Sequence, residues 1–197
     1  MCSALDCEDK SDEELVVLTL QNRECFVCII NRYENKLLRY MKRISNMPEE
    51  ELQDILQETF IKAYYNLNNF DSDLKFSSWV YRIAHNSIID AHRKNKIRPQ
   101  GNLVDIEDSL LQNIASDTNV LKEVDQKYIR KNIEDALENM EQKYREVLVL
   151  KFFEEKDYKE ISDILKKPMG TVATLLNRAK KKLKEEIIKQ GTNPYQS

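Results

Sequence analysis

Glycine and proline are scarce in this sequence, so few positions interrupt its regular structure. The 197 residues include three glycines and four prolines. Between them, apolar side chains recur every three or four positions, which is the spacing of an amphipathic helix, and no useful stretch alternates apolar with polar residues. The sequence therefore predicts an all-α fold without a sheet. One such apolar stripe consists of Leu52, Ile55, Leu56, Phe60, Ala63 and Leu67.

The region from Arg98 to about Asp125 lacks this helical period. It is rich in acidic residues and poor in aromatic ones, which favours an extended linker over an element of a core. We therefore expect two small helical domains, which also suits the length of the chain. The expected divisions are 1–98 for the first domain, 99–125 for the acidic linker, 126–190 for the second domain and 191–197 for a tail.

Charge is distributed unevenly along the chain. The formal net charge is -3, so the overall balance does not indicate a nucleic-acid-binding protein. Basic residues nevertheless concentrate in two stretches, 75–98 and 178–184, and acidic residues dominate the segment between them. This pattern predicts two basic surfaces separated by an acidic spacer.

The stretch "FSSWVYRIAHNSIIDAHRK", residues 76–94, predicts a helix with two different faces. Its apolar arc is typical of a core-facing helix. A plain solvated face seldom includes a tryptophan, so the opposite arc indicates a binding surface. The apolar arc contains Val80, Ile83, Ala84, Ser87, Ile88 and Ala91, and the other arc contains Trp79, Arg82, Asn86, Asp90 and Arg93.

The stretch "YKEISDILKKPMGTVATLLNRAKKKL", residues 158–183, predicts a helix-turn-helix. We expect a tight turn at "KKPMG", with Gly170 in an unusual backbone conformation and Thr171 helping to cap the second helix. Short polar groups followed by cations suit a helix that enters a major groove, although a helical hairpin with a solvated basic face would use the same residues. The outward-facing residues are predicted to be Thr171, Thr174, Asn177, Arg178 and Lys181.

Three stretches in order resemble the extracytoplasmic-function sigma factors of bacterial RNA polymerase. They are "DILQETFIKAYYNLNNF", "FSSWVYRIAHNSIIDAHRK" and "YREVLVLKFFEEKDYKEISDILKKPMGTV", and the resemblance runs from about Leu15 to Leu183. It implies a sigma factor that binds core polymerase at the clamp helices of the largest subunit and at the flap, and that reads and melts promoter DNA. It also implies control by an anti-sigma protein.

The resemblance assigns residues to each of these contacts. Trp79 is left with two roles, support for an unstacked base or packing within the domain. The polymerase contacts it implies are Asp54, Gln57, Glu58 and Lys62. The minus-ten contacts are Asn68, Asn69, Asp71, Trp79, Arg82, Asn86, Arg93 and Lys94. The minus-thirty-five contacts are Thr171, Thr174, Asn177, Arg178, Lys181 and Lys182.

The second helix of the helix-turn-helix departs from the family pattern at Ala173, Thr174 and Leu175. The minus-thirty-five sequence that it recognises should therefore differ from that of other family members. The acidic linker is expected to occupy the polymerase cleft or RNA exit path, although an inert spacer would have the same composition.

Chemistry beyond binding is not predicted. No glycine-rich phosphate loop occurs, and His85 and His92 are expected to be polar surface residues, so we expect no enzyme activity, no cofactor and no metal. A first rival interpretation is an ordinary helix-turn-helix regulator that binds duplex DNA without core polymerase. A second is a thiol-based metal or redox sensor built on Cys2, Cys7, Cys25 and Cys28.

The location of the protein bears on these cysteines. No signal peptide or membrane span is recognisable, so a cytoplasmic location without membrane insertion is expected. In that compartment the cysteines should be reduced thiols, with Cys25 and Cys28 acting as small buried hydrophobic residues.

Overall fold

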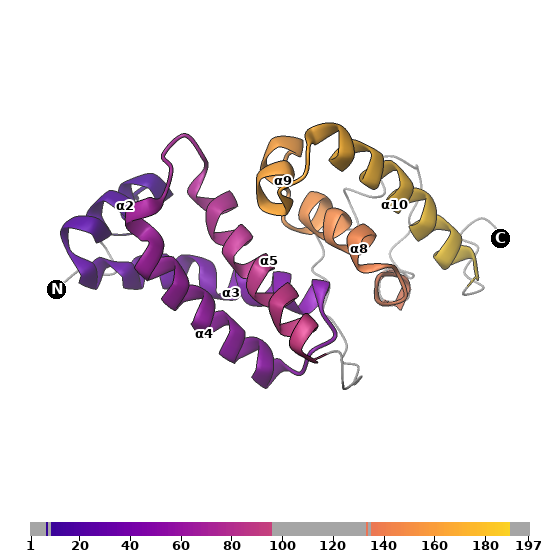
Figure 1. Cartoon of the computed structure of the whole chain (residues 1–197), viewed down its shortest axis with the longest axis horizontal. Helices are drawn as coiled ribbons and strands as arrows, with labels where there is room; N and C mark the ends of the chain where they lie inside the picture. Colours follow the sequence, from indigo (N-terminus) through magenta and orange to yellow (C-terminus); the bar gives the residue numbers. More distant parts are fainter. Residues whose placement is uncertain (1–6, 8, 96–132, 134, 190–197) are drawn as a thin grey trace. The chain divides into compact units, whose positions relative to one another are not determined.

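The computed structural model describes residues 7, 9–95, 133 and 135–189, and the regular secondary structure in this part of the chain is entirely helical (Figure 1). The chain divides into two compact units, and the main boundary between them follows Gln100. The expectation of an all-α protein with two helical domains is therefore confirmed. The predicted linker, 99–125, and the tail, 191–197, lie outside the described residues.

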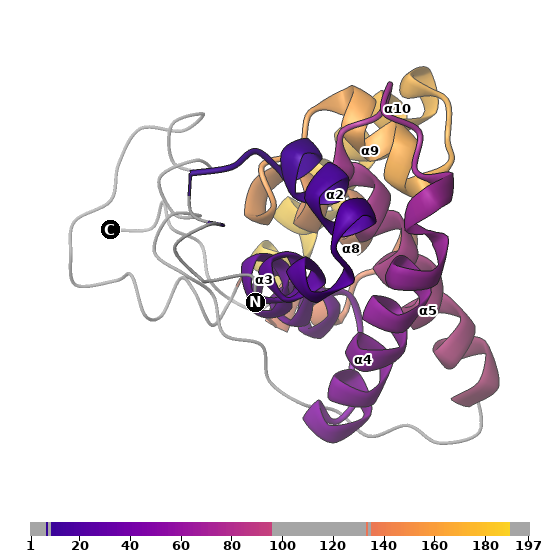
Figure 2. The same ribbon diagram turned by 90° about the vertical axis from the view of Figure 1, so that its left-hand side faces the viewer.

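The first unit is built around α4, which packs against α3 on one side and α5 on the other. Helix α2 contacts both α3 and α5. Figure 2 shows these helices from a second side. Two short 3-10 turns, η1 before α3 and η2 after α4, complete the unit. The bounds are α2 Asp12–Gln21, η1 Arg23–Cys25, α3 Phe26–Ile44, α4 Glu49–Asn66, η2 Leu67–Asn69 and α5 Phe76–Asn95.

Local sequence signals explain where these helices start. Helix α2 opens with a capping box, in which the Ser11 hydroxyl accepts from the Glu14 amide at 3.2 Å and the Glu14 carboxylate accepts from the Ser11 amide at 2.7 Å. Helix α4 starts directly after Pro48, with three glutamates in its first turn. Negative charge there is stabilised by the positive end of the helix dipole.

The core of the first unit contains the apolar stripe predicted on α4. All six of its residues, from Leu52 to Leu67, are buried. Tyr40, Phe76 and Ile88 from the neighbouring helices are fully buried, and burial of such side chains contributes about 1.5–3 kcal/mol each.

The prediction that His85 is a surface residue is wrong. Its side chain is buried at 8% exposure, and its Nδ1 lies 3.0 Å from the Tyr40 hydroxyl of α3. A buried polar ring needs such a partner, and the packing of α3 on α5 supplies one.

The second unit packs α10 against α8 (Figure 1). Residues 133 and 135–138 are helical and precede α8, and the Arg145 guanidinium donates to the backbone carbonyls of Glu138 and Met140. Both bonds come from one terminal nitrogen of a guanidinium whose pKa is lowered by burial. The bounds are α8 Gln142–Leu148, the π-helical turn η3 Val149–Phe153, α9 Tyr158–Leu165 and α10 Met169–Lys189.

The predicted helix-turn-helix is present, but its turn differs in detail from the prediction. Lys166 adopts the positive φ, at 53°, whereas Gly170 already lies inside α10. The helix starts early because the Pro168 carbonyl accepts from the amides of Thr171, at 2.8 Å, and Val172, at 3.0 Å. Thr171 therefore lies in the first turn and not at a cap.

The expectation of reduced thiols is also wrong for this structure. Cys7 and Cys28 form a disulfide, and Cys25 is disulfide-bonded as well. The pairing brings together residues 21 positions apart in the sequence, which local pattern did not reveal. Cys25 and Cys28 are buried, as expected.

Candidate functional site

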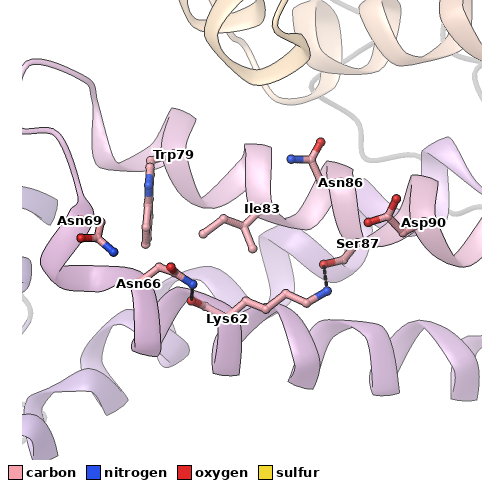
Figure 3. Close-up of a pocket in the computed structure, with 8 residues that line it drawn as sticks. All are labelled: Lys62, Asn66, Asn69, Trp79, Ile83, Asn86, Ser87 and Asp90. Carbon is pink, nitrogen blue, oxygen red and sulfur yellow. Dashed lines mark hydrogen bonds between the residues drawn. The ribbon is translucent and has the colours of Figure 1, made fainter.

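A pocket of about 390 Å³ lies in the first unit, between α4 and α5 and next to η2 (Figure 3). Its wall combines three amides, one amine, one carboxylate, one hydroxyl and two apolar side chains. Such a mixture suits a planar, hydrogen-bonding ligand better than a purely apolar one. The lining residues are Lys62, Asn66, Asn69, Trp79, Ile83, Asn86, Ser87 and Asp90.

Lys62 crosses the groove from α4 to α5. Its amine lies 3.1 Å from the Ser87 hydroxyl (Figure 3). The same amine lies 3.9 Å from the Glu58 carboxylate. The sequence grouped Lys62 with the polymerase-binding stripe, but the structure brings its charge into the pocket. Among the lining residues it is the single cation, so it supplies the positive charge at the wall of the pocket.

Trp79 forms the aromatic part of the pocket wall. Its side chain is only 5% exposed, and its ring packs edge-on against Phe70 and tilted against Phe76, with centroid distances of 5.5 and 5.6 Å. The helical wheel separates Trp79 from the core-facing arc of α5, yet its side chain is buried, because the segment after η2 folds back and covers it with Phe70. Of its two proposed roles, packing within the unit is present, and Trp79 still lines the pocket.

The pocket amides come from separate elements. Asn86 is exposed on α5 and Asn69 is exposed in η2, and both line the pocket. The sequence assigns both to minus-ten contacts, and that assignment stays a prediction. Asn66, which the sequence did not single out, donates to the Lys62 carbonyl at 2.8 Å. That bond fixes the orientation of its side chain at the end of α4.

Several other predicted minus-ten residues surround the pocket without lining it. The Asp71 carboxylate accepts from the Asp73 amide at 3.0 Å, which shapes the loop before α5. The Arg93 guanidinium lies 3.6 Å from the Asp90 carboxylate at the pocket edge. Asn68 and Lys94 are exposed, and Arg82 is half-buried.

Sequence reasoning missed Asn66, Ile83 and Ser87 as pocket residues. Ile83 and Ser87 were placed on the core-facing arc of α5, and Asn66 was taken as part of a polar loop. The i,i+4 spacing of Lys62 and Asn66 was available as a signal. This spacing indicates a pocket only when α5 is known to lie opposite α4.

The outer face of α4 carries an exposed polar stripe. Asp54, Gln57 and Glu58 are all exposed and lie on the side away from the buried stripe of the same helix. They are spaced at three and four, so they form one continuous row. The row offers carboxylates and an amide to a partner surface.

In the second unit, the outward face of α10 has the composition predicted for it. Thr171, Asn177 and Arg178 are exposed, as are Thr174 and Lys181. The Thr174 hydroxyl donates to the Gly170 carbonyl at 2.9 Å, so its oxygen stays available as an acceptor.

Lys182 differs from its neighbour Lys181. Its amine lies 3.0 Å from the Glu141 carboxylate and 5.2 Å from the Tyr144 ring centroid. This contact with Glu141 raises the pKa of Lys182, while Lys143 and Lys182 together lower the pKa of Glu141. The predicted DNA contact therefore already has a partner within the unit.

Two further classes of site were sought in the described part of the chain. No described helix is long and apolar enough to cross a membrane. Within the same residues, no group of three or more His, Cys, Asp or Glu side chains is arranged to bind a metal.

Comparison with protein families gives two matches, which follow the two units. Residues 29–97 match the model of sigma-70 region 2, and residues 130–183 match the model of sigma-70 region 4. The first match contains the pocket and the stripe on α4. The second contains the helix-turn-helix.

Curated relatives match along most of their length. The ECF RNA polymerase sigma factor SigW of Bacillus subtilis is 34% identical over 171 residues, which covers 84% of this chain and 90% of that protein. The ECF RNA polymerase sigma-E factor of Haemophilus influenzae is 29% identical, covering 91% and 97% respectively.

Solved structures share the fold. CnrH, solved in complex with the cytosolic domain of CnrY, matches with a TM-score of 0.65 and 22% identity over 89% of this chain and 96% of that one. The sigma factor RpoE of Bartonella quintana, solved with the anti-sigma factor NepR, matches with a TM-score of 0.63 and 16% identity over 82% and 96%.

Proposed function

The chain belongs to the extracytoplasmic-function sigma factors of the sigma-70 family, and we propose that it separates polymerase docking, strand binding and duplex reading onto three distinct surfaces. As a sigma factor it directs RNA polymerase to promoters. The ordinary helix-turn-helix regulator is not favoured, because such a regulator would not account for the region 2 match.

The exposed row on α4 docks on the clamp helices of core polymerase. Asp54, Gln57 and Glu58 supply acceptors and negative charge, which suit a basic partner surface and would speed association. Lys62 lies at the pocket end of the same helix, so its amine belongs to the strand-binding surface.

The pocket between α4 and α5 receives an unpaired base of the minus-ten element. The observation that carries this proposal is that Asn86 and Asn69, from different elements, line one pocket that also has an aromatic wall and one cation. Amides pair with base edges, and an amine binds the adjoining phosphate. Unstacking a base costs a few kcal/mol, so several such contacts acting together are required.

The α10 helix enters the major groove of the minus-thirty-five element. Its first turns present Thr171, Thr174 and Asn177 to base edges, and Arg178 and Lys181 follow with charge for phosphates. Because Lys182 is engaged by Glu141, it contributes less than Lys181 does. The same unit is expected to contact the polymerase flap.

The protein acts in the cytoplasm, where RNA polymerase is found, and performs no bond-making chemistry of its own. An anti-sigma protein regulates it by covering the polymerase-binding row. The solved relatives named above were themselves crystallised with such partners or with a cytosolic domain.

Run-off transcription tests the proposal directly. Core polymerase is incubated with promoter-containing genomic fragments, with and without the purified protein. New discrete start sites support the assignment and reveal the promoter motif. Unchanged transcription, together with duplex binding and no co-elution with core polymerase, would contradict it.

A further inference from the structure

We propose that Cys7 and Cys28 form a reversible, peroxide-sensitive disulfide that ties the segment before α2 to α3 and steadies the start of α5. The two cysteines are bonded in the structure, with their Cα atoms 5.8 Å apart. The bond joins the start of the described chain to the first turn of α3. Nothing in the sigma-factor role requires such a link.

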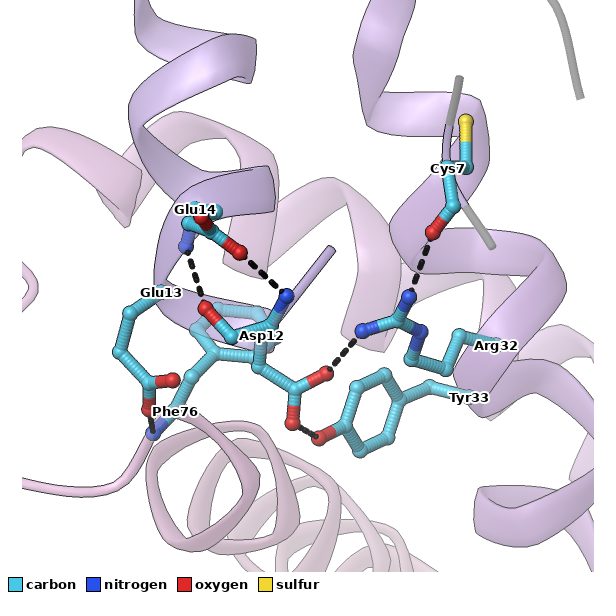
Figure 4. Close-up of polar contacts among 8 residues, drawn as sticks. Cys7, Asp12, Glu13, Glu14, Arg32, Tyr33 and Phe76 are labelled. Carbon is cyan, nitrogen blue, oxygen red and sulfur yellow. Dashed lines mark hydrogen bonds and ion pairs between the residues drawn. The ribbon is translucent and has the colours of Figure 1, made fainter. Parts of the chain in front are cut away.

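Polar contacts beside the disulfide hold the same two segments together. The Arg32 guanidinium of α3 donates to the Cys7 carbonyl at 2.7 Å and to the Asp12 carboxylate at 2.8 Å (Figure 4). The Tyr33 hydroxyl donates to the other oxygen of Asp12. Arg32 and Tyr33 of α3 therefore bind the segment that contains Cys7 and Asp12. These contacts hold Cys7 close to Cys28 of the same helix.

Helix α2 passes this restraint on to α5. The Glu13 carboxylate, next to Asp12, accepts from the Phe76 amide at 3.3 Å, at the first residue of α5 (Figure 4). Phe76 packs against Trp79, and Trp79 lines the strand-binding pocket. The disulfide therefore lies at one end of a continuous set of contacts that reaches the pocket wall.

The chemistry is a two-electron oxidation. A peroxide oxidises one thiol to a sulfenic acid and leaves as water, and the second thiol then attacks that sulfur and releases a second water. Both residues are buried, Cys7 at 9% and Cys28 at 4% exposure, and the product is the same whichever thiol reacts first. A cellular dithiol reverses the bond by exchange. In the cytoplasm, disulfides that do form are typically transient and redox-sensing.

Mass spectrometry of the full chain tests the bond. The variant Cys2→Ser/Cys25→Ser keeps only the proposed pair. Stoichiometric peroxide should remove one pair of hydrogens from it, and non-reducing peptide mapping should link Cys7 to Cys28. Excess dithiothreitol should restore both thiols. The added variant Cys7→Ser should show no link. Persistent free thiols in the double variant would overturn the proposal, as would a different pairing, or zinc bound to all four thiols, in the native chain.

The single tryptophan of the chain tests the link to the pocket. In the same double variant, oxidation should change the emission of Trp79 and raise the Tm of the first unit by about 10 °C, because the bond restrains the unfolded chain. Neither change should occur in the variant that also lacks Cys7. Identical emission and Tm in the oxidised and reduced forms would refute the structural role, whatever the outcome of transcription assays.

Discussion

The Lys62 amine of α4 lies 3.1 Å from the Ser87 hydroxyl of α5. This bond joins the helix to which we assign polymerase docking to the helix to which we assign strand binding. Since Glu58 of the docking row lies within 3.9 Å of the same amine, the two surfaces share one charged group. The placement of Lys62 therefore determines which function it serves.

Replacing Lys62 with methionine should weaken strand binding. The change keeps the length of the side chain but removes the positive charge at the pocket wall. We expect about a tenfold loss of affinity for a single-stranded minus-ten oligonucleotide, or about 1.4 kcal/mol, with a smaller dependence on salt. Fluorescence anisotropy with the holoenzyme measures both. Ser87→Ala, which leaves the charge in place, is the matched control and should lose less.

Asn86 and Glu58 should separate the two functions. Asn86→Ala removes a pocket amide and should impair promoter opening while leaving polymerase binding intact. Glu58→Lys reverses a charge in the docking row and should weaken polymerase binding first. Potassium permanganate footprinting reports opening, and co-elution with core polymerase reports docking. Equal loss of polymerase binding by both variants would show that the surfaces are not separate.

Much of the first unit could be predicted from periodicity alone. The stripe on α4 needs no knowledge of its neighbours, because its apolar spacing already identifies the buried side. Asp54, Gln57 and Glu58 follow as the opposite face. For the same reason the outward residues of α10 were predicted correctly.

Residues whose environment depends on a second element could not be predicted in this way. Trp79 is buried by Phe70, and His85 is satisfied by Tyr40, and neither neighbour can be inferred from the α5 helical wheel. The long side chain of Lys62 reaches across to α5, so its position at the pocket wall does not follow from the pattern of α4 alone. The pairing of Cys7 with Cys28 likewise depends on how the segment before α2 folds back.

Acidic conditions should stabilise the second unit through Glu146. Burial raises the pKa of this carboxyl to about 7 from an ordinary value of 4.5. The folded state therefore keeps its proton where the unfolded state loses it. The resulting stability is fully present below about pH 4.5 and is lost as the pH rises through about 7, with a total on the order of 3 kcal/mol at most.

Glu146→Gln tests this contribution, because glutamine stays neutral at every pH. The variant should flatten the fall in Tm between pH 5 and 8 by calorimetry of the full chain, in the transition of the second unit. Glu155→Gln, at an exposed position, is the control and should show the same decrease in Tm between pH 5 and 8 as the native protein. If Tm decreased by the same amount in Glu146→Gln, the pH dependence would come from other groups.

Asp12 should contribute to the stability of the first unit. Asp12→Asn removes the charge that Arg32 binds and weakens the acceptor for the Tyr33 hydroxyl. We expect a loss of about 1–3 kcal/mol in the free energy of unfolding by urea, since both contacts are partly buried. Asp9→Asn, at an exposed position nearby, is the control and should cost much less.

Adjacent lysines of α10 should differ in their contribution to duplex binding. Lys181 is exposed and no ion pair in the described part of the second unit engages it, whereas the Lys182 amine is held 3.0 Å from Glu141. Lys181→Ala should therefore reduce the salt dependence of minus-thirty-five binding by about one phosphate contact, and Lys182→Ala should reduce it less. Neither change should alter sequence preference, because phosphate contacts carry no base information. Arg178→Ala, measured in the same titration against sites with single base changes, should relax that preference if its guanidinium reaches a base edge. Equal salt slopes for Lys181→Ala and Lys182→Ala would mean that DNA displaces Glu141 and recruits Lys182.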